Sequence, residues 1–292
     1  MNKLPAAKRA QILHLLVEGS SMRSVARVAD VSINTVFKLH ADAGKACAAF
    51  HHEMVRNVAA KRVQCDEIWS FVYAKAKNVS TAKAAPEDAG DVWTWTALDA
   101  DSKLIISWLM GGRDAGYAHE FMQDVAERLS TRVQLTTDGH KAYLEAVEGA
   151  FGADVDYAQL VKLYGESPEA FKGRYSPAEC VGIRKQAVTG SPDRKHVSTS
   201  YVERHNLTMR MSMRRFTRLT NAFSKKAENH GHSLALYFVY YNFVRTHKAL
   251  RMTPAMAAGI VKSPMEMSDL VAMVDAYHER EAKRPKLVAQ AN

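Results

Sequence analysis

Cysteine is scarce in this chain, and the few cysteines do not form a recognisable site. Three occur among 292 residues, at Cys47, Cys65 and Cys180, with no CxxC pair and no cysteine–histidine spacing typical of zinc. An odd and scattered set of cysteines excludes a disulfide framework and is typical of a reduced, cytosolic protein.

Long apolar runs are lacking as well. No stretch of about 18 apolar residues occurs, so we expect no membrane-spanning helix. The first 19 residues are charged and amphipathic, without the continuous apolar region of a secretory leader, and we expect none. Internal repeats are also absent from the sequence. A length of 292 residues leaves room for two domains with a substantial core.

Acidic side chains are few in two blocks of the chain, although the sequence has 31 of them. The net charge is +6 over residues 1–64, −9 over residues 65–171 and +13 over residues 172–262. Such basic blocks favour a phosphate backbone as partner, because phosphate contacts are made mainly by lysine and arginine.

The first basic block has the pattern of a small helical DNA-binding unit. Ser21 and Ser32 can cap two helices that are separated by a short break. This arrangement is typical of a helix-turn-helix, whose second helix enters the major groove; a purely structural helical cap is the alternative. We expect a DNA-binding domain over residues 1–45, followed by a helical linker over 46–62. The expected DNA contacts are Ser32, Asn34, Thr35 and Lys38.

The middle of the chain alternates strand-like and helical segments. Three strands come first, followed by a helix, a strand, a helix and a strand, which predicts a mixed sheet with helices on its faces in an α/β domain. Residues 161–200 hold several prolines and glycines, so we expect a loop-rich insertion there, and a helical, then frayed tail over 261–292. The expected strands are 63–74, 92–98, 104–110, 133–137 and 155–160, and the expected helices are 117–129, 141–150, one starting near residue 200, and 233–246.

Three acids lie far apart in the chain but in informative settings. Asp66 lies on the first expected strand, Asp138 ends the fourth, and Glu203 lies on a basic helix. A parallel pairing of the two strands would bring the aspartates side by side. Converged carboxylates are costly unless divalent cations neutralise them, and two such cations can support phosphodiester chemistry. Three unrelated surface acids are the alternative.

Two further observations bear on this cluster. Glu67 competes with Asp66, because neighbouring residues of a strand point to opposite faces and only one is expected to join the cluster. Arg210 follows Glu203 by seven residues, which places it two helical turns away on nearly the same face, and Arg214 continues that row. The row would lead a phosphate backbone past the acid; a solvated basic face is the alternative.

Four segments carry a family resemblance. They are DEIWSFV at 66–72, TTDGHKAY at 136–143, YVERHNLTMRMSMRRFTRLTNAFSKK at 201–226 and YYNFVRTHKALRMTPAMA at 240–257. With them the chain resembles insertion-sequence transposases of the DDE type, most closely the insertion-sequence-one family. The resemblance implies a ribonuclease-H-like catalytic domain over residues 63–260.

The resemblance also implies an activity and a site. It implies cleavage of insertion-element ends and joining of the 3′-hydroxyl to target DNA, with two Mg²⁺ ions that Mn²⁺ can replace. It assigns Asp66, Asp138 and Glu203 as catalytic metal ligands, and Arg210 as a basic catalytic residue. The implied partners are double-stranded DNA and further copies of the chain, in the bacterial cytoplasm and its nucleoid. The basic residues expected to contact DNA are Arg210, Arg214, Arg215, Arg218, Arg245 and His247.

The chain departs from that family in one respect. Family members can carry an N-terminal zinc-binding module, for which this chain has no cysteine cluster, so recognition of DNA ends is expected to fall to the helix-turn-helix. A segment shared by several such transposases supplies an expected packing and DNA-contacting element. Its residues are Tyr241, Asn242, Arg245, His247, Thr253 and Pro254. The alternatives are a non-catalytic DNA-binding regulator or domesticated remnant, and a nuclease that cuts without joining.

Overall fold

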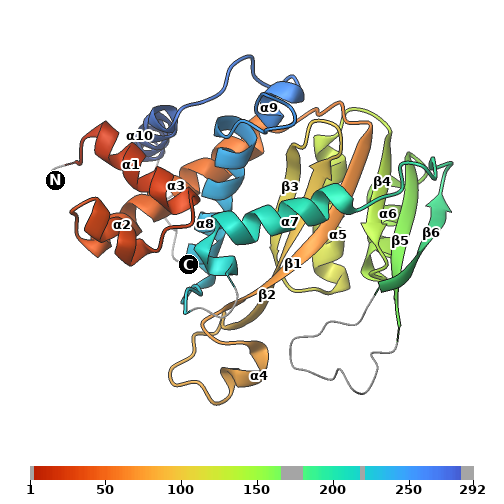
Figure 1. Ribbon diagram of the computed structural model, residues 1–292, viewed down its shortest axis with the longest axis horizontal. Coiled ribbons are helices and arrows are strands. Elements are labelled where there is room, and N and C mark those ends of the chain that lie inside the picture. Colours follow the sequence, from red (N-terminus) through yellow and green to blue (C-terminus); the bar gives the residue numbers. More distant parts are fainter. Residues whose placement is uncertain (1–2, 166–179, 218–220, 284–292) are drawn as a thin grey trace, which may run out of the picture.

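A six-stranded mixed sheet forms the centre of the computed structural model, which describes residues 3–165, 180–217 and 221–283 (Figure 1). The strands lie in the order β3-β2-β1-β4-β5-β6. β1, β2 and β3 are antiparallel neighbours, β4 and β5 run parallel to β1, and β6 is antiparallel to β5. Their bounds are β1 Arg62–Val72, β2 Gly90–Asp99, β3 Ile105–Gly111, β4 Val133–Asp138, β5 Val155–Tyr164 and β6 Cys180–Thr189. The α/β architecture predicted from the sequence is confirmed.

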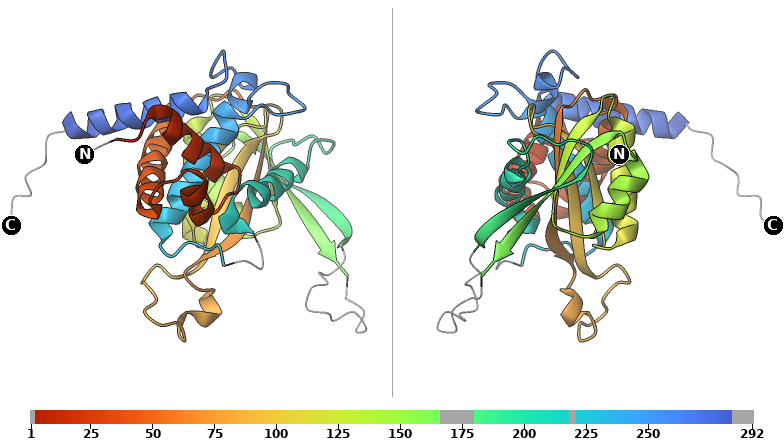
Figure 2. Two further views of the ribbon diagram at one scale, coloured as in Figure 1. Left: turned by 60° about the vertical axis from the view of Figure 1, so that its left-hand side comes forward. Right: turned by 90° about the vertical axis from the view of Figure 1, so that its right-hand side faces the viewer.

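Helices cover both faces of this sheet (Figure 2). α5 (Ala115–Arg128) and α6 (Ala142–Phe151) cover one face, where Trp95 of β2 packs against Phe121 and Tyr143. α7 (Ser200–Ser212) and α8 (Ala227–Val239) cover the other, where Ile68 of β1 belongs to a separate apolar cluster. Shorter or peripheral elements are α4 Ala76–Val79, the 3₁₀ turn η2 Arg214–Phe216, the π turn η3 Tyr240–Val244, α9 Pro254–Ala257 and α10 Met267–Lys283.

The N-terminal region contains the predicted helices. They are α1 (Ala6–Val17), α2 (Met22–Val28) and α3 (Ile33–Met54). The Ser21 hydroxyl caps α2 by accepting the Ser24 N–H, and the Ser32 hydroxyl caps α3 by accepting the Asn34 N–H. α3 continues into the predicted helical linker and ends at Met54. Residues 55–61 were expected to be helical and are not.

α3 packs closely against α8. Gly44 makes this approach possible, because a Cβ atom there would lie 2.3 Å from Cβ of His232. One apolar cluster then extends from Ile12 through α3 to Tyr157 of β5, so the N-terminal helices share a core with the sheet. This packing fixes the position of α3 relative to the strands.

The prediction of a loop-rich insertion over residues 161–200 is partly wrong. β5 continues to Tyr164 and pairs with β6, forming a two-stranded extension that leaves the body of the sheet (Figure 2). Most side chains of β6 are exposed, so its sequence has no alternation of buried and exposed residues that would identify a strand. Residues 166–179 lie outside the described part.

Two other expectations are modified. The helix expected at 233–246 begins earlier, at Ala227, and gives way at Tyr240 to the π turn. The helical start of the expected tail is present as α10, and its frayed end falls on residues outside the described part. Within the described ranges, no helix has the length and apolar character needed to cross a membrane.

Candidate active site

The parallel pairing of β1 with β4 brings two of the predicted acids together. Gln64 pairs with Thr136 at the last position of this ladder, and Asp66 and Asp138 each lie two residues beyond it. Asp66, Glu67 and Asp138 each offer a carboxylate oxygen within 4.8 Å of the others. The sequence-based expectation that Asp66 and Asp138 become neighbours is therefore confirmed.

The expectation that only one of Asp66 and Glu67 joins the cluster is wrong. Their side chains do point to opposite faces: Asp66 accepts a hydrogen bond from Asn206 of α7 (2.8 Å), and Glu67 accepts one from the Tyr143 hydroxyl of α6 (2.9 Å). The β1–β4 ladder has ended at this level, so Asp138 stands at an open strand edge that both faces can reach. An acidic cluster with two sides results.

Glu67 occupies the enclosed side. Its side chain has no exposed surface, and Nε of Arg113 donates to it at 2.7 Å. Burial and the charge of Asp138 raise the pKa of Glu67, while the hydrogen bonds from Arg113 and Tyr143 lower it. Arg113 also lies 3.8 Å from Oδ2 of Asp138. The carboxylate of Glu67 is thus already paired with two protein donors.

Asp66 is less fully compensated. Burial, followed by the charges of Glu67 and Asp138, raises its pKa to about 7. Its partner Asn206 has a second polar atom, Oδ1, that is buried and has no hydrogen-bond partner within the described structure. Carboxylate and amide oxygens are the ligands that hard divalent cations prefer. The uncompensated charge and this amide oxygen fit a divalent cation beside Asp66.

Glu203 lies near this open side without belonging to the tight cluster. Oε1 of Gln64 accepts the N–H groups of Tyr201 (2.9 Å) and Val202 (3.2 Å), which fixes the first turn of α7 on β1. Glu203 follows in that turn, three residues before Asn206, and its charge acts on Asp66. Nζ of Lys162 lies 2.7 Å from Oε2 of Glu203.

The basic residues predicted along α7 have different environments. Arg210 shares α7 with Glu203, as expected, and Arg214 is exposed in η2. The Arg215 guanidinium donates to the Ser224 hydroxyl at 2.5 Å, and burial lowers its pKa to about 10. Arg218 lies outside the described residues.

The segment after α8 packs against the sheet. The Asn242 side chain accepts the N–H of Ile105 and donates to its carbonyl, both at 2.9 Å, and Thr253 caps α9. Arg245 is exposed and donates to Ser212 at 3.4 Å, while His247 is half-buried. This segment therefore combines a packing role with an exposed cationic side chain.

The first turns of α3 present the residues expected to contact DNA. Ser32, Asn34 and Lys38 are exposed and Thr35 is half-buried, whereas Val36 faces the core. The exposed side of these turns is therefore polar and basic apart from Phe37, which is also exposed.

Three residues that contact the acids were not predicted from the sequence. Arg113 follows a Gly-Gly break, Lys162 lies on an expected loop, and Asn206 is three residues after Glu203. Only Asn206 had a usable signal, since an i, i+3 spacing on a helix places it on the same side as Glu203. The roles of Arg113 and Lys162 depend on strand pairing that the sequence does not show.

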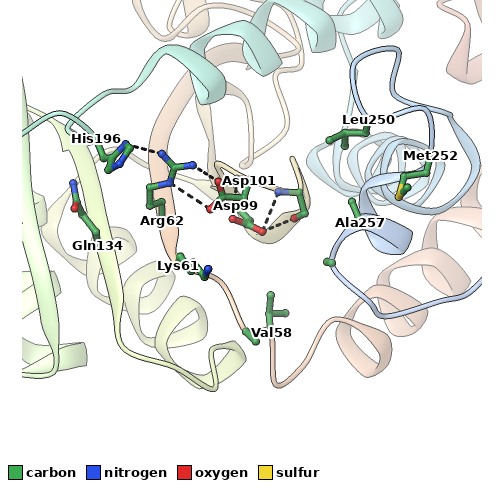
Figure 3. A pocket seen from close by; sticks show the side chains of 13 residues that line it. Val58, Lys61, Arg62, Asp99, Asp101, Gln134, His196, Leu250, Met252 and Ala257 are labelled. Carbon is green, nitrogen blue, oxygen red and sulfur yellow. Dashed lines mark hydrogen bonds and ion pairs between the residues drawn. The ribbon is translucent and has the colours of Figure 1, made fainter. Parts of the chain in front are cut away.

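A separate hollow lies away from the acids. A pocket of about 820 Å³ opens at the start of β1, where Arg62 pairs with Asp101 and with Nδ1 of His196 (2.7 Å; Figure 3). Arg62 precedes Asp66 by four strand residues, or about 13 Å. The pocket is lined by paired charges and by Leu250 and Met252, and none of the four acids described above lines it.

Comparison with known proteins gives likenesses among solved structures only. No protein-family model matches the chain, and no curated protein matches it. The chain is similar to the piggyBac transposase in the cryo-EM structure of its synaptic complex with hairpin DNA, with 10% sequence identity and a TM-score of 0.39. The likeness covers 97% of this chain and 73% of that one.

Proposed function

We propose that the chain is a DNA transposase of the DDE type, with a ribonuclease-H-like catalytic domain, that cleaves insertion-element ends and joins the 3′-hydroxyl to target DNA. The observation that carries the proposal is the convergence of Asp66 and Asp138 on two parallel strands, beneath a basic helix that holds Glu203. Carboxylates gathered from two strands repel each other, and a bound divalent cation would offset this repulsion.

The proposed catalytic acids are Asp66, Asp138 and Glu203. Asp66 faces α7, the helix of Glu203, while Asp138 at the strand edge is accessible with 34% of its side chain exposed. Glu67 is instead enclosed and bonded to Arg113 and Tyr143, so we assign it a positioning role. Of the two neighbouring acids, we therefore propose Asp66 as the catalytic one.

These residues would hold two divalent cations, Mg²⁺ or Mn²⁺. Such cations, when bound, supply activation of a water or 3′-hydroxyl nucleophile and charge stabilisation of the leaving oxygen. The chain orients its own ligands: Asn206 holds Asp66, and the His140 N–H holds Oδ1 of Asp138 at 2.9 Å. Arg210 on α7 would provide positive charge for a phosphate backbone. Arg214 does not continue its helical row, because α7 ends at Ser212 and Met213 is extended, but it is exposed in η2 and would add to this charge.

Duplex DNA would be held by the helix-turn-helix. Asn34 and Lys38 project from the first turns of α3, and the packing of α3 on α8 fixes them relative to the acids. A copy that binds one DNA end needs a second copy for the other end, so we propose a dimer or larger assembly on DNA.

Cleavage and strand-transfer assays test this function. DNA carrying the sequences that flank the coding region is incubated with Mg²⁺ and the wild-type chain, Asp66→Asn, Asp138→Asn or Glu203→Gln. We expect the cleavage activity of each variant to fall by more than the roughly 10- to 100-fold that is typical when a residue supporting the metal ligands is replaced. Glu127→Gln is the matched control, because Glu127 is an exposed acid on α5.

Each other outcome identifies another function. Duplex binding without cleavage by the wild-type chain would make it a DNA-binding regulator. Cleavage without joining would make it a nuclease. Undiminished cleavage in any one of the three variants would remove that residue from the proposed mechanism.

A further inference from the structure

Four aromatic side chains form a continuous row that begins beside the acidic cluster. Trp93 of β2 is the cross-strand partner of Trp69 on β1. The ring centroids of Trp69 and Phe71 are 5.8 Å apart, with an interplanar angle of 36°. Those of Phe71 and Phe223 are 5.2 Å apart, with an interplanar angle of 34°. We call Trp93, Trp69, Phe71 and Phe223 the aromatic ladder.

Trp93 packs against the larger apolar cluster, but the other three ladder residues are not explained by core packing. Trp69, Phe71 and Phe223 belong to none of the apolar clusters found among the described residues, and all three are partly exposed. On the opposite face of the same strand, Ile68 and Val72 are fully buried. This end of β1 is therefore covered on one side only, and the uncovered side carries its largest side chains.

Cations lie over two rings of the ladder. The Arg113 guanidinium carbon is 4.6 Å from the centroid of Trp93, and Nζ of Lys75 is 5.5 Å from that of Trp69. Arg113 also bonds Glu67 and approaches Asp138, so it connects the ladder to the acids. Exposed lysines flank the ladder in both segments that border it: Lys75, Lys77, Lys225 and Lys226.

Two acids of this region are engaged elsewhere. Asp91 accepts the Ala76 N–H at 2.9 Å, and Asp88 accepts the Ala227 N–H at 2.6 Å. Their carboxylates serve to fix the loop after β1 and the start of α8. Glu87 of the same loop is exposed, and the four lysines named above outnumber these three acids.

The ladder is also held in place before any ligand binds. The Tyr73 N–H donates to the Ser224 carbonyl at 2.7 Å, and Val72 forms a parallel bridge with Ser224. Phe223 is thereby fixed against β1. A preorganised surface of this kind orders fewer side chains on binding and so loses less affinity.

We propose that the aromatic ladder binds unpaired nucleotides of a DNA strand by stacking their bases. Aromatic faces accept any base, and interleaved cations contact the phosphates, which is the common chemistry of single-strand binding. The choice of DNA rests on the proposed function. The ladder lies on the strand face of Glu67, opposite to that of Asp66, and Arg113 connects it to Asp138 at the strand edge. An apolar protein partner would not need the cations.

Binding of oligothymidylate of about ten nucleotides, measured with the full chain in EDTA, tests this inference. Fluorescence anisotropy of a labelled oligonucleotide gives the affinity, and tryptophan quenching reports stacking. Trp69→Leu is expected to weaken binding about 5- to 150-fold, the range for loss of one stacked base, and Trp69→Phe to restore most of it. Binding to blunt duplex should not change.

Tyr277→Leu is the matched control. Tyr277 on α10 also has a cation over its ring, Arg280 at 6.0 Å, but it lies outside the ladder. Its replacement should leave oligonucleotide affinity unchanged. Thermal unfolding of each variant confirms that it is folded, and Lys75→Gln, which removes only a surface charge, should weaken binding independently of ring packing.

The outcomes separate this inference from the proposed function. The assay needs no metal and no cleavage, so a chain that never cleaves DNA can still bind the oligonucleotide through the ladder. Absence of oligonucleotide binding by the wild-type chain would overturn the inference. Equal affinities of the wild-type chain, Trp69→Leu and Lys75→Gln would overturn it as well, even if Asp66→Asn abolished cleavage.

Discussion

Asp66 and Glu67 show how one step along a strand changes the role of a carboxylate. Glu67 is enclosed and bonded to Arg113 and Tyr143, whereas Asp66 faces α7 and has one amide donor from Asn206. The first arrangement resembles a structural ion pair, and the second leaves charge for a ligand to neutralise. Asp138 at the strand edge lies close to both Glu67 and Asp66.

Replacement of these two residues should therefore affect stability in different ways. Glu67→Gln leaves the Arg113 guanidinium without its charged partner and should lower the free energy of unfolding by about 1–3 kcal/mol. Asp66→Asn removes a buried like charge and should not lower it. Urea denaturation in EDTA measures both. A larger loss of stability in Asp66→Asn than in Glu67→Gln would contradict these roles.

Lys162 supplies another residue-scale prediction. Its ammonium is 2.7 Å from Glu203, and both side chains are more than one-third exposed. Because it competes with a cation for the same carboxylate, Lys162→Met should tighten Mn²⁺ binding by up to about fivefold, the strength of an exposed ion pair. Isothermal titration calorimetry measures the change, with Lys103→Met as control. Weaker Mn²⁺ binding in Lys162→Met would assign Lys162 a supporting role instead.

At the scale of elements, the packing of α3 against α8 determines where the proposed DNA-reading helix stands relative to the sheet. α3 spans Ile33–Met54, so its first turns are exposed while its second half is packed against α8. A single helix thus connects the expected groove contacts to the domain that holds the proposed catalytic acids. Its close approach to α8 depends on Gly44.

Gly44 at this contact and Gly231, which lies on α8 near Met110 of β3, should respond in opposite directions to alanine. A Cβ at position 44 would meet Cβ of His232 at 2.3 Å, so Gly44→Ala should lower the free energy of unfolding by about 1–3 kcal/mol through overpacking. At Gly231 the nearest atom is 3.9 Å away, and Gly231→Ala should raise it by about 0.5–1 kcal/mol through helix propensity. Thermal unfolding compares them. Stabilisation by Gly44→Ala would contradict the packing.

The sequence predicted the elements that have clear periodicity or caps, and missed those without them. β1, β2, β4 and the capped helices α2 and α3 were found because apolar spacing and the hydroxyls of Ser21 and Ser32 identify them. β6 was missed because its side chains are exposed. The acids Asp66 and Asp138 could be paired from their strand positions, whereas the contribution of Arg113 depends on tertiary packing alone.

At the scale of the whole molecule, buried neutral histidines make folding depend on pH. His51 and His230 are buried, and burial, the largest cause, lowers the pKa of each to about 3. The unfolded value is about 6.5. Below pH 6.5 the unfolded chain therefore binds more protons than the folded chain. The contribution of these histidines to the free energy of unfolding is fully present above pH 6.5 and is lost as the solution is acidified towards pH 3.

This dependence can be measured between pH 7 and pH 5. Each histidine should contribute up to about 1.4 kcal/mol of lost stability per pH unit below its unfolded pKa. Urea denaturation of the wild-type chain and of His230→Asn measures the slope. The free energy of unfolding of His230→Asn should fall less steeply with decreasing pH, because the unfolded variant has one protonation site fewer. An unchanged slope would contradict the neutral, buried state of His230.

Mn²⁺ binding, measured by calorimetry, tests whether the gathered acids hold divalent cations, and it needs no knowledge of the DNA ends. We expect the wild-type chain to bind Mn²⁺, Asp66→Asn, Asp138→Asn and Glu203→Gln each to weaken this binding by more than about tenfold, and Glu127→Gln to bind as the wild type does. No binding by the wild-type chain, or undiminished binding by the Asp66 and Asp138 variants, would contradict the proposal that these acids hold divalent cations.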